Sequence, residues 1–308
     1  MGNTTSHVNI DLLPPNQKLV GLNNLSNSCS FSAVLQILYH LSPLRTAILS
    51  LPPSSDNNIT NSLRELFACM DAYPRPYGSL EPRAFLSTFK SNEARFQGND
   101  QQDSHEVFQS LLTHLPEFIS NIFKGEGYYS TRCMECDYVS TRSQSFFDLP
   151  VEITENVSLI TAINSLFDPE IMSNDDQIHC DNCHLKTECE RKFNIDELPT
   201  VLVIQLKRFK FYYECNSFVK LNKRLNIPFN LELKSKNYKL SSFIVHVGDS
   251  FFRGHYIAIV RLNSDLLWAA IDDAKFEILH DYQIERYFGS IEGVSNASIY
   301  LATYVMID

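Results

Sequence analysis

An α+β fold is predicted by a change of hydrophobic pattern along this chain of 308 residues. Between residue 29 and about residue 125, apolar residues recur at the spacing of helices that bury one face. From about residue 126 onward, short runs rich in β-branched and aromatic residues are bounded by Asn, Asp, Gly and Pro, as strands and their turns are. Because the helices come first and the strands later, we expect the two kinds of element to be segregated.

Three helices are predicted in the first part of the chain, and each has an apolar stripe. The stripes are Phe31, Val34, Leu35 and Leu38; Leu63, Leu66, Phe67 and Met70; and, within residues 104–115, Val107, Phe108, Leu111, Leu112 and Leu115. The polar residues 51–61 are predicted to form a loop, and the Pro-rich residues 73–78 end the second helix.

Strands are predicted for the short β-rich runs that follow. They cover residues 128–131, 138–141, 146–151, 200–211, 242–247, 255–260 and 267–271. Residues 1–18 have the composition of a flexible polar tail, and we expect residues 19–308 to form a single domain.

The composition excludes several classes of protein. Hydrophobic residues make up 44% of the chain and aromatic residues 12%, which is too apolar for a disordered protein. The 36 acidic and 26 basic residues leave a net charge of −10, so we expect no nucleic-acid partner, and a basic partner fits better. No apolar run has the length of a transmembrane segment.

The first residues also bear on where the protein resides. They lack the basic and apolar regions of a secretory signal, so the cytoplasm, the nucleus or both are expected. Gly2 and Ser6 fit a myristoylation pattern, which an ordinary start of a chain also explains.

Four of the eight cysteines form two C-x-x-C pairs, Cys133 with Cys136 and Cys180 with Cys183. Such a pair places two thiolates on one tight turn, and two pairs complete the tetrahedral shell of a structural zinc ion. The alternative is four buried thiols without metal, and His179 and His184 could compete as ligands. Ordinary buried or spare thiols are expected at the remaining positions outside the pairs, which are Cys69, Cys189 and Cys215.

Cys29 is a candidate nucleophile because the first apolar helix begins there. Asn27 or Ser28 is suited to cap that helix, and the positive end of a helix dipole favours a thiolate. A buried packing role is the alternative reading. The side chains of Asn23, Asn24 and Asn27 could donate to an oxyanion, although Asn-rich loops are also ordinary turns.

His255 is the candidate general base, since it follows a glycine and opens a predicted strand. Asp272 and Asp273 come 17 and 18 residues later, a spacing that lets a hairpin return a carboxylate to the imidazole. A core histidine and a turn at the end of a strand are the alternatives.

These residues lie in motifs that resemble the ubiquitin-specific proteases, a family of papain-like cysteine proteases. The matching segments are 21–29 with 34–36, 101–106, 198–199 with 206–209, 246–248 with 254–256, and the two C-x-x-C pairs. The resemblance implies a hand-like fold with a zinc-stapled β extension. Its thumb would cover about residues 19–125, its fingers about 126–150 and part of 175–230, and its palm the remainder, mainly 195–308.

The resemblance also implies a role for each matching residue. Cys29 corresponds to the nucleophile and His255 to the general base. Asp272 corresponds to the residue that orients the base, Asn24 to the oxyanion donor, and Asp273 to an acid that supports the site. The residues expected to bind the basic tail of ubiquitin or to line its channel are Asp103, Glu106, Gln102, Gly254 and Tyr256. The expected reaction is hydrolysis after the C-terminal glycine of ubiquitin.

Several positions depart from the family pattern, among them Ser26, where the family has glycine. The other departures are Ser28, Ser32, Ile271 and the pair Val107 and Phe108, and none removes a catalytic group. Within the family, the chain is most similar to short members that WD-repeat proteins activate. The alternative functions are an inactive or weak ubiquitin-binding module that depends on a partner, a zinc-ribbon regulatory protein, and a protease for another ubiquitin-like protein.

Overall fold

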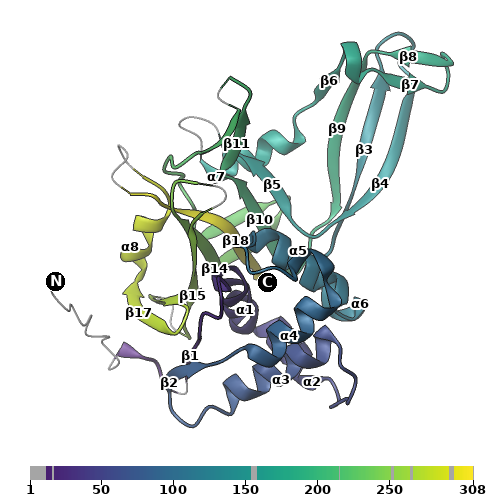
Figure 1. Ribbon diagram of the computed structural model, residues 1–308. Coiled ribbons are helices and arrows are strands. Elements are labelled where there is room, and N and C mark those ends of the chain that lie inside the picture. Colours follow the sequence, from purple (N-terminus) through teal and green to yellow (C-terminus); the bar gives the residue numbers. More distant parts are fainter. Residues whose placement is uncertain are drawn as a thin grey trace.

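The fold was examined in a computed structural model that describes residues 12–15, 17–153, 158–214, 216–250, 253–263, 266–290 and 295–307. Gly2, Ser6, Cys215 and most of the predicted tail lie outside these residues. The model has a layer of helices, a large sheet and a long β extension (Figure 1), which confirms the α+β prediction. None of the described helices is long and apolar enough to cross a membrane.

The helical layer corresponds to the predicted thumb. Its helices are α1 (Cys29–His40), α2 (Ser42–Ser50), α3 (Ile59–Asp71), α4 (Arg83–Asn92), α5 (Ser104–His114) and α6 (Glu117–Ser120), with the 3-10 turn η2 (Ala94–Phe96) between α4 and α5. Strands β1 (Leu19–Leu22) and β2 (Tyr77–Leu80) pair in parallel beside it. The loop predicted for residues 51–61 ends earlier, because the Asn58 side chain caps α3 by accepting from the Asn61 N–H at 2.9 Å.

The palm is a sheet of eight strands. In spatial order these are β17 (Lys275–His280), β16 (Leu267–Asp272), β15 (His255–Arg261), β14 (Lys236–Val247), β18 (Ala297–Ile307), β10 (Val201–Lys207) and β5 (Leu149–Glu152), and β13 (Asn230–Leu233) pairs with β14. Helix α8 (Asp281–Ile284) and the 3-10 turn η5 (Glu285–Tyr287) follow β17.

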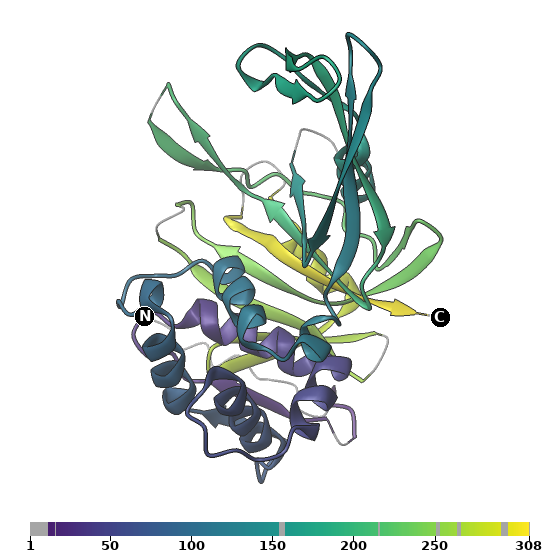
Figure 2. The same ribbon diagram turned by 90° about the vertical axis from the view of Figure 1, so that its right-hand side faces the viewer.

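Alternate side chains of the palm strands enter two different cores, as the period of a strand requires. On β15, Ala258 and Val260 pack in a core with the thumb helices, whereas Ile259 packs in the core on the opposite face. That second core includes Trp268 and residues of α7 (Leu159–Asn164), which is followed by the 3-10 turn η3 (Ser165–Phe167). Figure 2 shows the helices gathered at one end of the molecule and the extension at the other.

The extension, which we call the fingers, is a sheet in the order β4 (Val139–Phe146), β3 (Gly125–Cys133), β9 (Cys189–Glu197) and β6 (Glu170–Met172). The small hairpin of β7 (Ile178–Cys180) and β8 (Leu185–Thr187) lies at its tip (Figure 1), after the 3-10 turn η4 (Asn174–Asp176). The residue limits predicted for tail, thumb, fingers and palm stay a prediction.

The single strand predicted for residues 200–211 is wrong, because the chain breaks at Arg208. Strand β10 ends at Lys207, and Phe209 begins the separate hairpin of β11 (Phe209–Tyr212) and β12 (Ser217–Lys220). The Arg208 side chain is fully buried and donates to four backbone carbonyls. They belong to Leu221, Lys223, Phe288 and Ile299, at distances of 2.5–3.2 Å. The run 146–151 is likewise divided between β4 and β5.

Replacing Arg208 with Met should lower the free energy of unfolding by at least about 3 kcal/mol, since each unsatisfied buried polar group costs roughly 1–3 kcal/mol. Urea denaturation measures this. Lys207→Met is the matched control next to it, because Lys207 is exposed and pairs only with Glu152 at 2.8 Å. That control should cost less than about 1 kcal/mol. Equal losses of unfolding free energy in both variants would contradict a stabilising role for the hydrogen bonds of Arg208.

Candidate active site

Cys29 is the first residue of α1 and is buried, with 3% of its surface exposed. The preceding loop turns sharply, since Ser26 and Asn27 have left-handed φ angles of 56° and 63°. Ser28 occupies the N-cap position, but its hydroxyl makes no cap hydrogen bond and instead accepts from the Leu25 N–H at 2.8 Å. The expected side-chain cap is therefore wrong, and the backbone N–H of Ser28 is satisfied by Asn24 Oδ1 at 3.0 Å.

His255 and Asp272 come together from neighbouring palm strands. His255 begins β15, Asp272 ends β16, and His255 Nε2 lies 2.5 Å from Asp272 Oδ1. Hydrogen bonds with Asp272 and with Cys29 raise the pKa of His255 to about 10. Since Nε2 faces Asp272, Nδ1 is the ring atom left to exchange a proton with the Cys29 sulfur.

The two adjacent acids have different surroundings. The hydrogen bond from His255 lowers the pKa of Asp272, whereas burial raises the pKa of Asp273. Asp273 has a φ of 51° in the tight turn between β16 and β17, and its side chain is only 15% exposed. Its backbone carbonyl accepts from the Leu22 N–H at 2.9 Å, so β1 holds the turn in place.

Asn24 bridges the loop before Cys29 and the turn that carries Asp273. Its Nδ2 donates to Asp273 Oδ2 at 2.9 Å while its Oδ1 accepts from Ser28. An amide nitrogen carries two protons, so one N–H remains for another acceptor. Asn27 instead donates to the Asn99 carbonyl at 2.9 Å, and neither contact involves Asn23.

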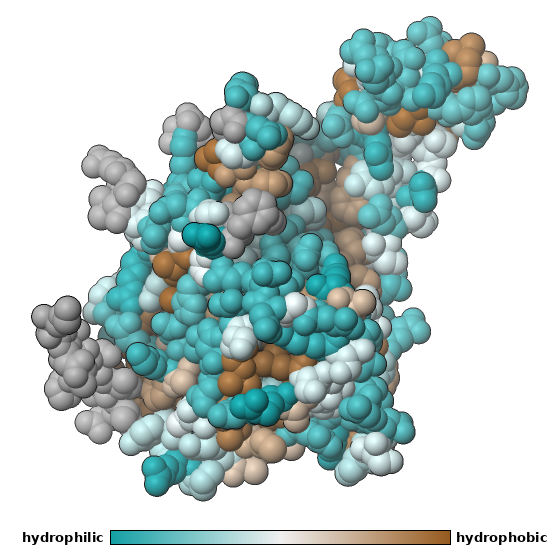
Figure 3. All heavy atoms as spheres, viewed as in Figure 1, coloured by the Kyte–Doolittle hydropathy of each residue, from teal (hydrophilic) through white to brown (hydrophobic). Residues whose placement is uncertain are grey.

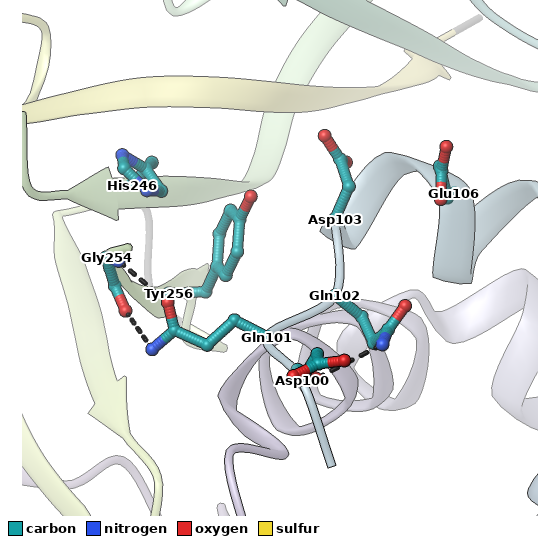
Figure 4. A pocket seen from close by; sticks show the side chains of 8 residues that line it. All are labelled: Asp100, Gln101, Gln102, Asp103, Glu106, His246, Gly254 and Tyr256. Carbon is teal, nitrogen blue, oxygen red and sulfur yellow. Dashed lines mark hydrogen bonds between the residues drawn. The ribbon is translucent and has the colours of Figure 1, made fainter. Parts of the chain in front are cut away.

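A pocket of about 340 Å³ adjoins His255 and is drawn in Figure 4. All five residues expected to bind the ubiquitin tail line it: Gln102, Asp103, Glu106, Gly254 and Tyr256. Asp100, Gln101 and His246 also line it, although the sequence patterns indicated no role for them. Gln101 and His246 lie inside the recognised motifs, which is the only signal that could have found them.

Three acids line this pocket, and two of them, Asp103 and Glu106, differ in their contacts. Asp103 caps α5 through the His105 N–H at 2.6 Å and accepts from the Tyr300 hydroxyl at 2.6 Å. Glu106 lies in the first turn of α5, where it is exposed. Glu106 is therefore the carboxylate more available to a basic ligand.

Among the residues that the structure describes, two groups of side chains have the spacing that a metal ion needs. The sulfur atoms of Cys133, Cys136, Cys180 and Cys183 lie within 4.8 Å of one another, as do the ligand atoms of His255, Asp272 and Asp273. The sulfur–sulfur distances of 3.9 Å for Cys133–Cys183 and 3.7 Å for Cys136–Cys180 match the edge of about 3.8 Å expected for tetrahedral zinc at about 2.3 Å from each sulfur. The cysteine group could therefore bind a metal, and it includes neither His179 nor His184. In the other group, His255 and Asp272 are already hydrogen-bonded to each other.

Asp272→Asn should lower the pKa of His255 from about 10 toward its ordinary value of 6.5, because the negative partner is lost. NMR titration of the histidine rings measures the shift. Asp148→Asn is the matched control, because Asp148 pairs with a different histidine, His105, at 3.0 Å.

The same pair makes stability depend on pH. The folded-state pKa of His255 lies above the unfolded value, so the stabilisation is complete below about pH 6.5 and disappears as the pH rises toward 10. Thermal unfolding across this range should show the decline in the parent chain and not in Asp272→Asn. A His255 pKa that stays the same in both chains would contradict the pairing.

Known proteins are similar in sequence to this chain over most of its length. A family model described as ubiquitin carboxyl-terminal hydrolase matches residues 20–301. Ubiquitin carboxyl-terminal hydrolase 4 of Arabidopsis thaliana is 27% identical over 338 aligned positions, which cover 93% of this chain and 92% of that protein. Ubiquitin carboxyl-terminal hydrolase 12 of Salmo salar is 27% identical over 330 positions, covering 92% and 88%.

These matches confirm the resemblance found in the motifs and the cysteine-peptidase class that it implies. Ubiquitin and ubiquitinated proteins are accordingly the partners of this class of hydrolase. The chain belongs to the ubiquitin carboxyl-terminal hydrolase family, whose members are deubiquitinating enzymes.

Proposed function

We propose that this protein hydrolyses the bond after the C-terminal glycine of ubiquitin with Cys29 as nucleophile, His255 as base and Asp272 as its orienting partner. The observation that carries the proposal is the 2.5 Å hydrogen bond between His255 and Asp272, next to a pocket with acidic lining. Cys29 contributes to the raised pKa of His255. A cysteine beside an imidazolium and at a helix start has the surroundings in which thiolates form.

The proton moves between Cys29 and His255 during the reaction. The Cys29 sulfur attacks the glycine carbonyl carbon, and the imidazolium then gives its proton to the leaving amine as the carbon–nitrogen bond breaks. Water, deprotonated by His255, attacks the resulting thioester and releases the ubiquitin carboxylate and the Cys29 thiol. Asp272 holds the imidazole in the orientation that presents Nδ1 throughout.

Asn24 and the start of α1 are suited to the developing oxyanion. The Asn24 amide is held by Asp273 and Ser28, which leaves one N–H for the substrate oxygen. The backbone N–H groups at the helix start supply further donors. Asp273 thus supports the site by fixing Asn24, not by contacting the reacting atoms.

The pocket favours a substrate tail that ends in residues without side chains and that also carries basic residues. Gly254 lies against His246 at one side of it, and Glu106 and Asp103 lie at the other. We infer that Gln102 and Tyr256 line the path of the Gly-Gly tail, and that Glu106 receives its basic residues.

For the cysteine cluster we propose structural zinc. Four thiolates leave no open coordination position, so the ion would staple the finger tip and take no part in catalysis. Cys133 and Cys136 come from the turn after β3, and Cys180 and Cys183 come from the β7–β8 hairpin. The metal would therefore join two turns that are far apart in the sequence.

A WD-repeat activator is proposed as a further partner, and the finger tip offers a surface for it. Large apolar side chains are exposed there (Figure 3), namely Met134, Tyr138, Val139, Ile171 and Leu185. Exposed apolar groups that gather in one region of a surface are typical of protein interfaces. The cytoplasm and the nucleus stay the predicted compartments.

Incubation with ubiquitin that carries a C-terminal electrophile should give a covalent adduct on Cys29. The chain gains the mass of one ubiquitin, and peptide mapping locates the bond. Cys29→Ala should give no adduct, whereas Cys69→Ala, which removes an exposed thiol of α3, should label fully.

An adduct at another cysteine, or one that survives Cys29→Ala, would contradict the assignment. If the folded chain gives no adduct alone but labels after addition of a WD-repeat partner, the enzyme needs its activator. If it labels in neither case, the inactive ubiquitin-binding module is the better description.

One zinc ion per chain is expected, and mass spectrometry of the metal content measures it. Cys180→Ser should lose the ion, because three thiolates hold zinc less well than four. Cys189→Ser should keep it, because Cys189 is buried beside the cluster but is not one of its four members. Retention of zinc by Cys180→Ser would contradict the proposed ligand set.

A further inference from the structure

The proposed catalytic groups sit on two separate parts of the molecule. Cys29 belongs to the thumb helix α1, whereas His255 and Asp272 belong to palm strands. Their mutual geometry therefore depends on contacts that tie thumb to palm. Asn24 with Asp273 is one such contact, and Gln101 with Gly254 is another.

Gln101 binds the backbone of the residue before the base through both ends of its amide. Its Nε2 donates to the Gly254 carbonyl at 2.9 Å, and its Oε1 accepts from the Gly254 N–H at 2.9 Å (Figure 4). A residue of an adjacent strand would make the same two hydrogen bonds. The pairing of β14 with β15 ends at Val247 and His255. The Gln101 amide therefore binds the backbone one residue beyond the last paired residue of β15.

Gly254 has no side chain of its own that could hold its backbone in place, so the contact with Gln101 has that role. A Cβ atom there would lie 2.0 Å from His246 Nε2 and 2.9 Å from the Val247 carbonyl oxygen, so only glycine fits. Glycine is also the residue with the most backbone freedom. Without the Gln101 amide, the N–H and the carbonyl of Gly254, the residue before His255, would lose these two hydrogen bonds.

The other end of this turn is held independently of the thumb. Lys220 is 8% exposed, and its Nζ donates to the carbonyls of His246 at 2.9 Å, Gly248 at 2.7 Å and Asn296 at 2.7 Å. The start of the turn is thus fixed within the palm. Loss of Gln101 should release only the end next to His255 and should leave the hairpin folded.

The segment that carries Gln101 is also bonded to the loop before the nucleophile. Asn27 Nδ2 donates to the Asn99 carbonyl at 2.9 Å, and Lys90 Nζ donates to the Gly98 carbonyl at 2.9 Å. Residues 98–101 therefore contact the Cys29 loop at one end and the peptide before His255 at the other.

We propose that Gln101 is a positioning residue for His255, which sets the imidazole relative to the Cys29 sulfur by clasping the Gly254 backbone. This rests on the proposed roles of Cys29 and His255. Both ends of its amide bind the Gly254 backbone, so its contacts act on the segment that leads to the base, although it lines the same pocket.

The test compares Gln101→Met, which keeps the length of the side chain and loses both hydrogen bonds, with Gln101→Glu, which keeps only the acceptor. Gln97→Met is the matched control, since Gln97 is exposed on the same segment between η2 and α5. Hydrolysis of a fluorogenic ubiquitin C-terminal amide gives kcat and KM, and thermal unfolding gives stability.

For Gln101→Met, kcat should fall about 10- to 100-fold, the size of effect that misplacement of a catalytic group by an ångström produces. KM and the unfolding temperature should match those of Gln97→Met. The kcat of Gln101→Glu should fall at least as far, because its carboxylate faces the Gly254 carbonyl. A rise in KM at unchanged kcat would make Gln101 a tail-binding residue and would overturn the proposal, as would parent-like kinetics.

A second readout needs no turnover. The hydrogen bond with Cys29 contributes to the raised pKa of His255, so NMR titration of Gln101→Met should give a lower His255 pKa than Gln97→Met. An unchanged His255 pKa would overturn the positioning role even if the parent chain proved inactive. Absence of the ubiquitin adduct on Cys29 in the parent chain would instead refute the proposed function, so the two failures are distinguishable.

Discussion

Burial of helix α1 is the constraint on which the site depends, because it presses the nucleophile against the palm sheet. Every residue from Cys29 to Tyr39 is buried, and Val34, Leu35 and Leu38 are fully so. Each such side chain contributes roughly 1.5–3 kcal/mol through burial. The helix packs in one core with Tyr256 and Ala258 of β15, the strand that begins with His255. Hydrophobic packing thus brings the Cys29 sulfur and the His255 imidazole together, and polar contacts refine their geometry.

The turn after β16 shows how two neighbouring carboxylates acquire different tasks from their surroundings. Asp272 ends the strand half-exposed and in contact with His255, so its pKa is lowered and it remains charged. Asp273 has a left-handed backbone and a side chain that is only 15% exposed, so its pKa is raised, and it holds Asn24. Opposite shifts in adjacent acids are a common sign of divided labour in an active site. Gly21 makes this possible, because a Cβ there would lie 2.6 Å from the Asp273 carbonyl oxygen.

Sequence patterns predicted those parts of the molecule whose conformation depends on residues close together in the chain. The stripes of α1, α3 and α5 and the hairpin of β15 and β16 lie where the periodicity placed them. By contrast, β18 is central to the palm but was not predicted, although its apolar run is long enough. The break at Arg208 could not be predicted, since it depends on carbonyls up to 91 residues away. For the site, residue types and order identified Cys29 and His255, whereas Gln101 acquires its contact only when residue 254 comes beside it.

The loop before Cys29 shows what the departure at Ser26 costs and how it is offset. A left-handed residue other than glycine costs about 1–2 kcal/mol, and both Ser26 and Asn27 adopt that conformation. Asparagine tolerates it better than most residues, and the Asn27 amide uses the resulting direction to reach Asn99. Hydrogen bonds from Leu25 to Ser28 and from Ser28 to Asn24 hold the remainder of the loop. The strain is therefore compensated by contacts that also connect the nucleophile to the segment carrying Gln101. Residues 98–101 are thus hydrogen-bonded both to the loop before the nucleophile, through Asn27, and to the residue before the base, through Gly254.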